Sequence, residues 1–135
     1  MVEDEHLARR AAREESALLR LVKLQNPSQA KLELAESLLK FRDATRHRVL
    51  GFDRFQDYCT GRLGIMPSTL RYYLQIARFM KGAGDSVSRE EWVALGPTRI
   101  RILAQAKVSK RSLPKLVRKY AEIPSRQMAE EFPRR

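Results

Sequence analysis

The stretch from Gly51 to Lys81, GFDRFQDYCTGRLGIMPSTLRYYLQIARFMK, limits most strongly what this chain can fold into. Its apolar residues recur at intervals of three and four on both sides of Gly61 and Gly64, which is the spacing of two amphipathic helices. Gly64 tolerates the positive φ of a sharp turn, and Pro67 favours the first position of a following helix. The stretch therefore predicts two helices joined by a tight turn.

The first of these helices has a start signal and an apolar side. Asp53 followed by Gln56 has the spacing of a capping box, which satisfies the first backbone N–H groups of a helix. The residues expected to face inward are Phe55, Tyr58, Cys59 and Leu63. Cys59 is interpreted as a small buried residue rather than a nucleophile, since it lies on this apolar side with no histidine nearby in sequence.

The second helix has an inner apolar side and an outer polar side. The residues expected to face inward are Leu70, Tyr73, Leu74, Ala77 and Met80. A polar and basic outer side after a glycine turn is the layout of a DNA-binding helix-turn-helix. Arginine can pair with guanine and glutamine with adenine in the major groove. The side chains predicted to contact bases are Ser68, Thr69, Arg71, Tyr72, Gln75 and Arg78.

The segment GFDRFQDYCTGRLGIMPSTLRYY resembles a helix-turn-helix pattern of bacterial and phage proteins, glycine-aromatic-x-x-F-x-x-Y followed by R-L-G-aliphatic-S-x-x-T. That pattern recurs in plasmid-partition proteins and in helical N-terminal regions of some HNH-nuclease-like proteins. The run STLRYY is also similar to the T-L-R-Y-Y run of MerR-type regulators. The resemblance covers about 30 of 135 residues and implies a DNA-binding protein.

Three departures limit what the resemblance implies. Met66 stands where the family usually has a Ser or Thr cap, and Leu74 stands where MerR-type proteins have an acidic residue. The third departure is that no hairpin sequence for a wing is present. The likeness to HNH-nuclease-like proteins does not bring their activity, because the sequence has no H-N-H cluster. The motif and its DNA-facing positions therefore carry over, but membership of one regulator family does not.

Charge points to a polyanionic partner. The chain has 27 Lys and Arg against 16 Asp and Glu, a net charge of +11, with the surplus greatest over residues 97–135. Double-stranded DNA is the first expectation; an anionic membrane surface or an acidic protein is the weaker one. The predicted DNA-backbone contacts are Arg46, Arg48, Arg54, Lys81, Arg99, Arg101, Lys110, Arg111, Lys115 and Lys119. Of these, Arg46 and Arg48 follow a predicted helix end together with Arg42 and His47. A favourable interaction with the helix dipole accounts for basic residues at that position as well as DNA-backbone contact does.

The whole chain is expected to be an all-α compact bundle of about six to eight helices, because no strand or hairpin pattern is present. Three regions are predicted. Residues 1–25 form a helical arm, either packed on its own domain or used for dimerisation. Residues 26–81 form a helical domain that contains the helix-turn-helix at 53–81, and residues 82–135 form a basic helical region packed on it.

Sequence signals mark most helix ends outside the motif. Asn26-Pro27-Ser28-Gln29 reads as a helix start, and residues 82–87 read as a flexible linker. Ser88 with Glu91 forms a capping box before Trp92, which is expected in the core. Gly96-Pro97 separates two helices, another helix begins near Ser112, and Ser125 is expected to cap the last.

Enzyme signatures are lacking in the sequence. His6 and His47 are isolated, and Asp53 and Asp57 are better explained by capping and exposure than by catalysis. We therefore expect no enzymatic activity, no metal or other cofactor and no small-molecule substrate. A single cysteine and the lack of an apolar run of about 20 residues suggest a cytoplasmic, nucleoid-associated protein without a membrane partner.

Two functional hypotheses follow from these patterns. The first is sequence-specific DNA binding as a bacterial or phage transcription regulator, with a helix at 67–81 in the major groove. The alternative is a helical adaptor for an acidic protein partner, or a DNA partition or nucleoid factor. RNA binding ranks lower because a sheet with stacking aromatics is not expected. A homodimer would place two recognition helices about one DNA turn apart. The sequence does not decide between a monomer and a dimer.

Overall fold

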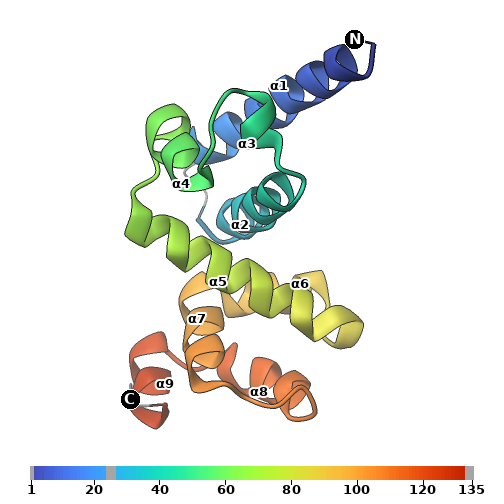
Figure 1. Ribbon diagram of the computed structural model, residues 1–135. Coiled ribbons are helices and arrows are strands. Elements are labelled where there is room, and N and C mark those ends of the chain that lie inside the picture. Colours follow the sequence, from blue (N-terminus) through green and yellow to red (C-terminus); the bar gives the residue numbers. More distant parts are fainter. Residues whose placement is uncertain (1, 24–26, 133–135) are drawn as a thin grey trace. The chain divides into compact units, whose positions relative to one another are not determined.

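A computed structural model describes residues 2–23 and 27–132 (Figure 1). Within those residues the chain forms nine α-helices and no strand, which confirms the predicted all-α fold. The helices are α1 (Val2–Lys23), α2 (Pro27–Asp43), α3 (Arg46–Val49), α4 (Phe55–Tyr58), α5 (Pro67–Ala83), α6 (Arg89–Leu95), α7 (Pro97–Ala106), α8 (Leu113–Tyr120) and α9 (Ser125–Glu131). A π-helical turn, η1 (Cys59–Leu63), follows α4, and a 3₁₀ turn, η2 (Gly84–Ser86), follows α5.

The number of helices exceeds the expected six to eight because the segment after α2 breaks into short pieces. Thr45 adopts a left-handed conformation with φ of 53° between α2 and α3, and Gly51 has φ of 93° after α3. A positive φ cannot continue a right-handed helix. These two positions therefore divide the region into one-turn helices.

The chain divides into two compact units, Met1–Leu74 and Gln75–Arg135, and helix α5 passes from the first into the second after Leu74. In the first unit, α1 packs against α2, α3 and η1, and α3 packs against α2 and α4. Ala11 and Leu18 of α1 are buried in this unit, at 0% and 2% exposure. A dimerisation role for α1 stays a prediction. The predicted boundaries between three regions, after residues 25 and 81, also stay a prediction.

The first unit has an aromatic core centred on Tyr58. Its ring stacks on Phe41 at a centroid distance of 4.9 Å and lies edge-on to Phe52 at 5.5 Å. The Tyr58 hydroxyl donates to Glu15 Oε2 at 3.0 Å, and Arg62 Nη2 donates to Glu15 Oε1 at 2.7 Å. Burial, followed by the Glu15 carboxylate, raises the pKa of Tyr58, so the hydroxyl stays a donor. This cluster links α1, α2 and α4 and holds η1 in place.

The second unit packs α6 against α7 and α8, and α7 against α9. Trp92 is buried at 4% exposure, as the sequence predicts, and its ring lies edge-on to Phe79. The predicted capping box is confirmed: Glu91 N donates to Ser88 Oγ at 3.2 Å, and Ser88 N donates to Glu91 Oε1 at 3.0 Å. The same carboxylate accepts from Arg118 Nε at 3.0 Å, which ties α8 to the start of α6.

Three local predictions are wrong. Helix α4 begins after Arg54 with no side-chain cap, so Asp53 and Gln56 do not form a capping box there. The expected linker at 82–87 is partly helical, because α5 continues through Gly82 and the positive φ of 61° falls at Gly84. Ser125 is the first residue of α9 rather than its cap. The predicted cap at Asn26 lies outside the described residues.

Replacement of Ser88 by alanine is expected to lower the free energy of unfolding by about 1 kcal/mol, because the Glu91 amide loses its acceptor. Urea unfolding followed by Trp92 fluorescence measures this. The matched control is Ser16→Ala, whose hydroxyl donates to the Ala12 carbonyl within α1 and caps no helix start. Equal losses in the two variants would contradict the assigned capping role.

Candidate nucleic-acid interface

The segment from α4 to α5 turns through η1 and the three residues that follow it. In η1 the wider i→i+5 pattern brings the Gly64 amide to the Cys59 carbonyl, and the Ile65 amide donates to the same carbonyl at 3.0 Å. Gly64 then adopts φ of 70°, the positive value expected from the sequence. Helix α5 begins at Pro67 as predicted, and the Leu70 amide donates to the Met66 carbonyl at 2.9 Å. Local sequence signals therefore account for both the turn and the restart.

Helix α5 has one buried side and one solvent side. Four of the six predicted base-contacting residues are exposed: Ser68, Thr69, Arg71 and Arg78. Tyr72 and Gln75 are half-buried, and the Tyr72 ring contacts that of Tyr73 at 5.6 Å. The buried residues are Leu70, Leu74, Ile76, Ala77 and Met80.

The inner side of α5 differs from the predicted one at two positions. Tyr73 was expected to face inward but is only half-buried, whereas Ile76 was not predicted and is fully buried at 0% exposure. The buried stripe of α5 is therefore wider than a strict three-four alternation.

Among the predicted backbone contacts, most basic side chains are exposed. These are Arg48, Arg54, Lys81, Lys110, Arg111, Lys115 and Lys119. Lys119 Nζ lies 5.0 Å from the centroid of the Tyr120 ring, a cation–π distance. An exposed cation of this kind is compatible with phosphate contact, which stays a prediction.

Arg46 and Arg99 have partners within the fold. Arg46 Nε donates to Glu14 Oε2 at 3.2 Å, and its side chain is 13% exposed. Arg99 donates to two backbone carbonyls, from Nη1 to Leu95 at 2.8 Å and from Nε to Ile123 at 2.9 Å. Arg101 is half-buried. These contacts give Arg46 and Arg99 structural roles that compete with the DNA contacts predicted for them.

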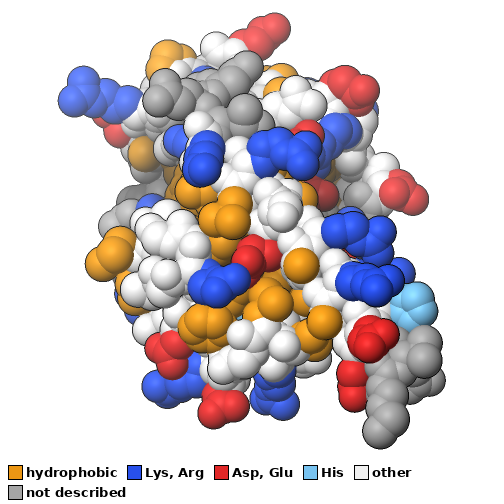
Figure 2. Space-filling model, turned by 90° about the horizontal axis from the view of Figure 1, so that it is seen from above, with side chains coloured by type: hydrophobic (Ala, Val, Ile, Leu, Met, Phe, Trp, Pro, Cys, Tyr) orange, Lys and Arg blue, Asp and Glu red, His pale blue; other side chains and the backbone are white. Residues whose placement is uncertain are grey.

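The surface charge is mixed on the face shown in Figure 2. Lys and Arg side chains lie there among Asp, Glu and hydrophobic side chains, so the positive field of that face is interrupted. In the turn before α5, Met66 is an exposed hydrophobic side chain, with 61% of its surface accessible.

Groups with reactive chemistry are buried or isolated. Burial raises the pKa of the Cys59 thiol to about 12, so the thiol is not ionised at neutral pH. His47 is buried at 5% exposure. Across the described residues, no group of three His, Cys, Asp or Glu side chains is arranged to hold a metal ion.

Within the part of the chain that the structure describes, none of the helices combines the length and the apolar character needed to cross a membrane. Comparison with protein-family models, curated proteins and solved structures found no match to this chain.

Proposed function

We propose that this protein binds double-stranded DNA sequence-specifically, with α4 to α5 acting as a helix-turn-helix and α5 entering the major groove. The observation that carries the proposal is Arg71. Its side chain is exposed near the start of α5, and no described residue forms an ion pair or hydrogen bond with it. An arginine in that state keeps all its donors for guanine N7 and O6.

The surroundings of Arg71 support the same role. Ser68 and Thr69 are exposed on the first turn of α5, where hydroxyl and backbone N–H groups can donate to a phosphate. The surplus of Lys and Arg in residues 97–135 supplies attraction that does not depend on base sequence. The proposed role is that of a transcription regulator, a partition factor or a nucleoid factor. All three roles require DNA recognition.

The second candidate is a helical adaptor that binds an acidic protein partner and no DNA. It is favoured by Met66, an exposed hydrophobic side chain in the turn before α5, and by the absence of a side-chain cap at that position. An exposed methionine is suited to a protein interface.

A fluorescence-anisotropy titration with random-sequence duplex at about 50 mM salt separates the two candidates. DNA binding predicts saturation at micromolar protein or below, with affinity falling steeply as salt rises. Lack of binding at micromolar protein would overturn the DNA proposal and favour the adaptor.

Replacement of Lys115 by alanine is expected to weaken binding to every duplex alike and to reduce the salt slope by about one. Lys115 is exposed on α8, where a phosphate contact would release one counterion. The measurement is the affinity for two unrelated duplexes at four salt concentrations. A loss confined to one of the two sequences would contradict a phosphate role.

A further inference from the structure

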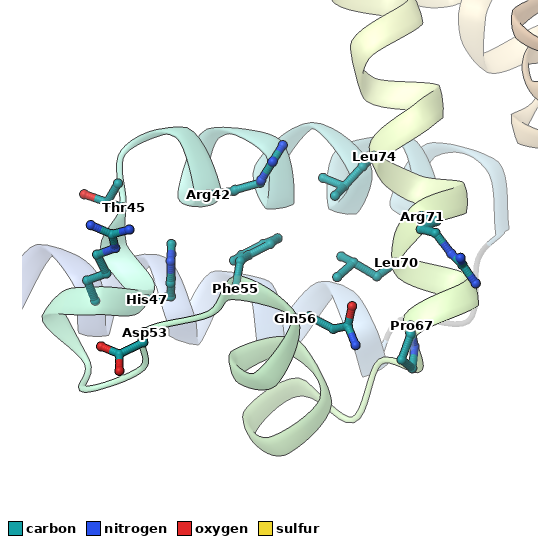
Figure 3. Close-up of a pocket in the computed structure, with 11 residues that line it drawn as sticks. Arg42, Thr45, His47, Asp53, Phe55, Gln56, Pro67, Leu70, Arg71 and Leu74 are labelled. Carbon is teal, nitrogen blue, oxygen red and sulfur yellow. The ribbon is translucent and has the colours of Figure 1, made fainter.

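A cleft of about 460 Å³ lies within the first unit, lined by residues from the end of α2, from α3, from the start of α4 and from the first two turns of α5 (Figure 3). In Figure 3, Phe55, Leu70 and Leu74 point toward the space between α2, α4 and α5, Arg42 lies beside it on α2, and the Arg71 side chain points away from it on the outer side of α5. The volume is within the range of small-molecule sites, roughly 300–1,000 Å³.

The polar lining of the cleft is strongly cationic. Arg42, Arg48 and Arg71 come from three different helices, and Asp53 is the one acidic residue among those that line it. Among the described residues, none of the three arginines forms an ion pair with a carboxylate. By contrast, Arg46, Arg62 and Arg118 each pair with a glutamate. The cleft therefore gathers cations that the fold leaves without counter-charges.

His47 gives a second, independent sign of a ligand. It lines the cleft, it is 5% exposed, and its Nδ1 is buried with no hydrogen-bond partner. Its ring lies edge-on to Phe55 at 5.4 Å. Burial, then Arg48 and then Arg42, lowers the pKa of His47, so the ring is neutral at pH 7. A buried polar atom without a partner is rare in native structures and calls for an explanation.

The apolar walls indicate what kind of anion fits. Phe55, Leu70 and Leu74 are buried, at 8%, 5% and 8% exposure, and Pro67 lines the same space. A bare inorganic ion would leave those walls unused, whereas a planar apolar group would pack on them. The guanidinium groups are suited to a carboxylate or phosphate, which they bind through two parallel hydrogen bonds.

We propose that this cleft binds a small organic anion, a carboxylate or phosphate attached to an apolar ring, with the anionic group beside His47, near Arg42 and Arg48, and the ring against Phe55 and Leu70. Arg71 belongs both to the cleft and to the proposed DNA-contacting side of α5.

The two histidines make a direct test possible by NMR, because His6 is exposed on α1 and serves as an internal control for His47. Phenyl phosphate, benzoate, phenol and inorganic phosphate are titrated into the full chain without DNA, so the result is independent of DNA binding. We expect saturable shifts of the His47 ring signals with phenyl phosphate and benzoate, and no such shifts at His6.

Bound benzoate is also expected to raise the pKa of His47 by about one pH unit, because an anion nearby favours the imidazolium. The charged groups that act on His47 are Arg42 on α2 and Arg48 on α3, and those that line the same cleft also include Asp53 before α4 and Arg71 on α5. By linkage, benzoate should bind up to about tenfold more tightly as pH falls through the His47 pKa.

Arg48→Gln is expected to weaken both aromatic anions about tenfold, while Arg13→Gln, an exposed arginine on α1 outside the cleft, leaves binding unchanged. Three results would overturn the proposal: no shift at His47, equal shifts at His6 and His47, or equal affinities for phenol, inorganic phosphate and phenyl phosphate. Equal weakening by the two variants would also contradict it.

Discussion

Arg71→Ala is expected to lower affinity for the preferred DNA site by about 1–3 kcal/mol, which is roughly a 5- to 150-fold rise in Kd. The reason is the loss of two parallel hydrogen bonds to one guanine from a side chain that has no partner within the described fold. Competition titrations with the preferred site and with duplexes altered at single positions would measure the loss and show base preference relaxed at one position.

The matched control is Arg13→Ala, which removes an exposed arginine of the first unit that lies away from α5 in sequence and has no proposed role. It should leave the preferred site bound as before. If Arg71→Ala weakened the preferred and the random duplex by the same factor, Arg71 would be a phosphate contact and not a reader of bases.

Tyr58→Ala is expected to lower the free energy of unfolding by about 3–5 kcal/mol, a large part of the total for a small protein. The substitution empties the centre of an aromatic cluster in which Tyr58 is 0% exposed and stacks on Phe41. It also removes the donor to Glu15, the carboxylate that joins α1 to η1 through Arg62. Urea unfolding followed by far-ultraviolet circular dichroism measures the change.

Tyr58→Phe separates the contribution of the buried ring from that of the hydroxyl hydrogen bond. It keeps the ring and removes only the hydroxyl, so a loss of about 1.5–3 kcal/mol is expected, the range for a hydrogen bond to a charged group. If the Tyr58→Ala variant unfolded at the same urea concentration as the unaltered protein, the Tyr58 ring would not be the centre of the core of the first unit.

Local signals in the sequence predicted the elements that depend on local chemistry. The Ser88 capping box, the positive φ at Gly64 and the restart at Pro67 each follow from two or three neighbouring residues. The buried stripes of α2 and α8 follow from helical periodicity, since Leu38 and Val117 recur with other apolar residues at three- and four-residue spacing. The exposed Arg71 and Arg78 were found in the same way.

Contacts between residues far apart in sequence could not be predicted. Nothing in the sequence distinguishes Glu14 and Glu15 from the other charged residues of α1. Their carboxylates nevertheless accept hydrogen bonds from Arg46, Tyr58 and Arg62, which lie more than thirty residues later in the chain. The cleft likewise combines residues from four separate helical segments, and nothing in the order of the chain marks them as neighbours.

Predictions from local helix signals were also wrong where tertiary packing or backbone geometry had the larger effect. Gly82 lowers helix stability by about 1 kcal/mol relative to alanine, yet α5 continues past it while Ile76 and Met80 of the same helix are buried. At Asp53 the capping pattern is present, but the backbone enters helix at Phe55 and no side-chain cap forms. A capping box is a reliable signal only when the preceding backbone can adopt the required geometry.

The most direct test of DNA recognition through α5 is a binding selection from a random duplex library, carried out with the unaltered protein and with Arg71→Ala. The account predicts a defined enriched site with the unaltered protein, containing a guanine whose enrichment disappears with the variant. Selected pools that remain as diverse as the starting library, or an identical enriched site for both proteins, would contradict it.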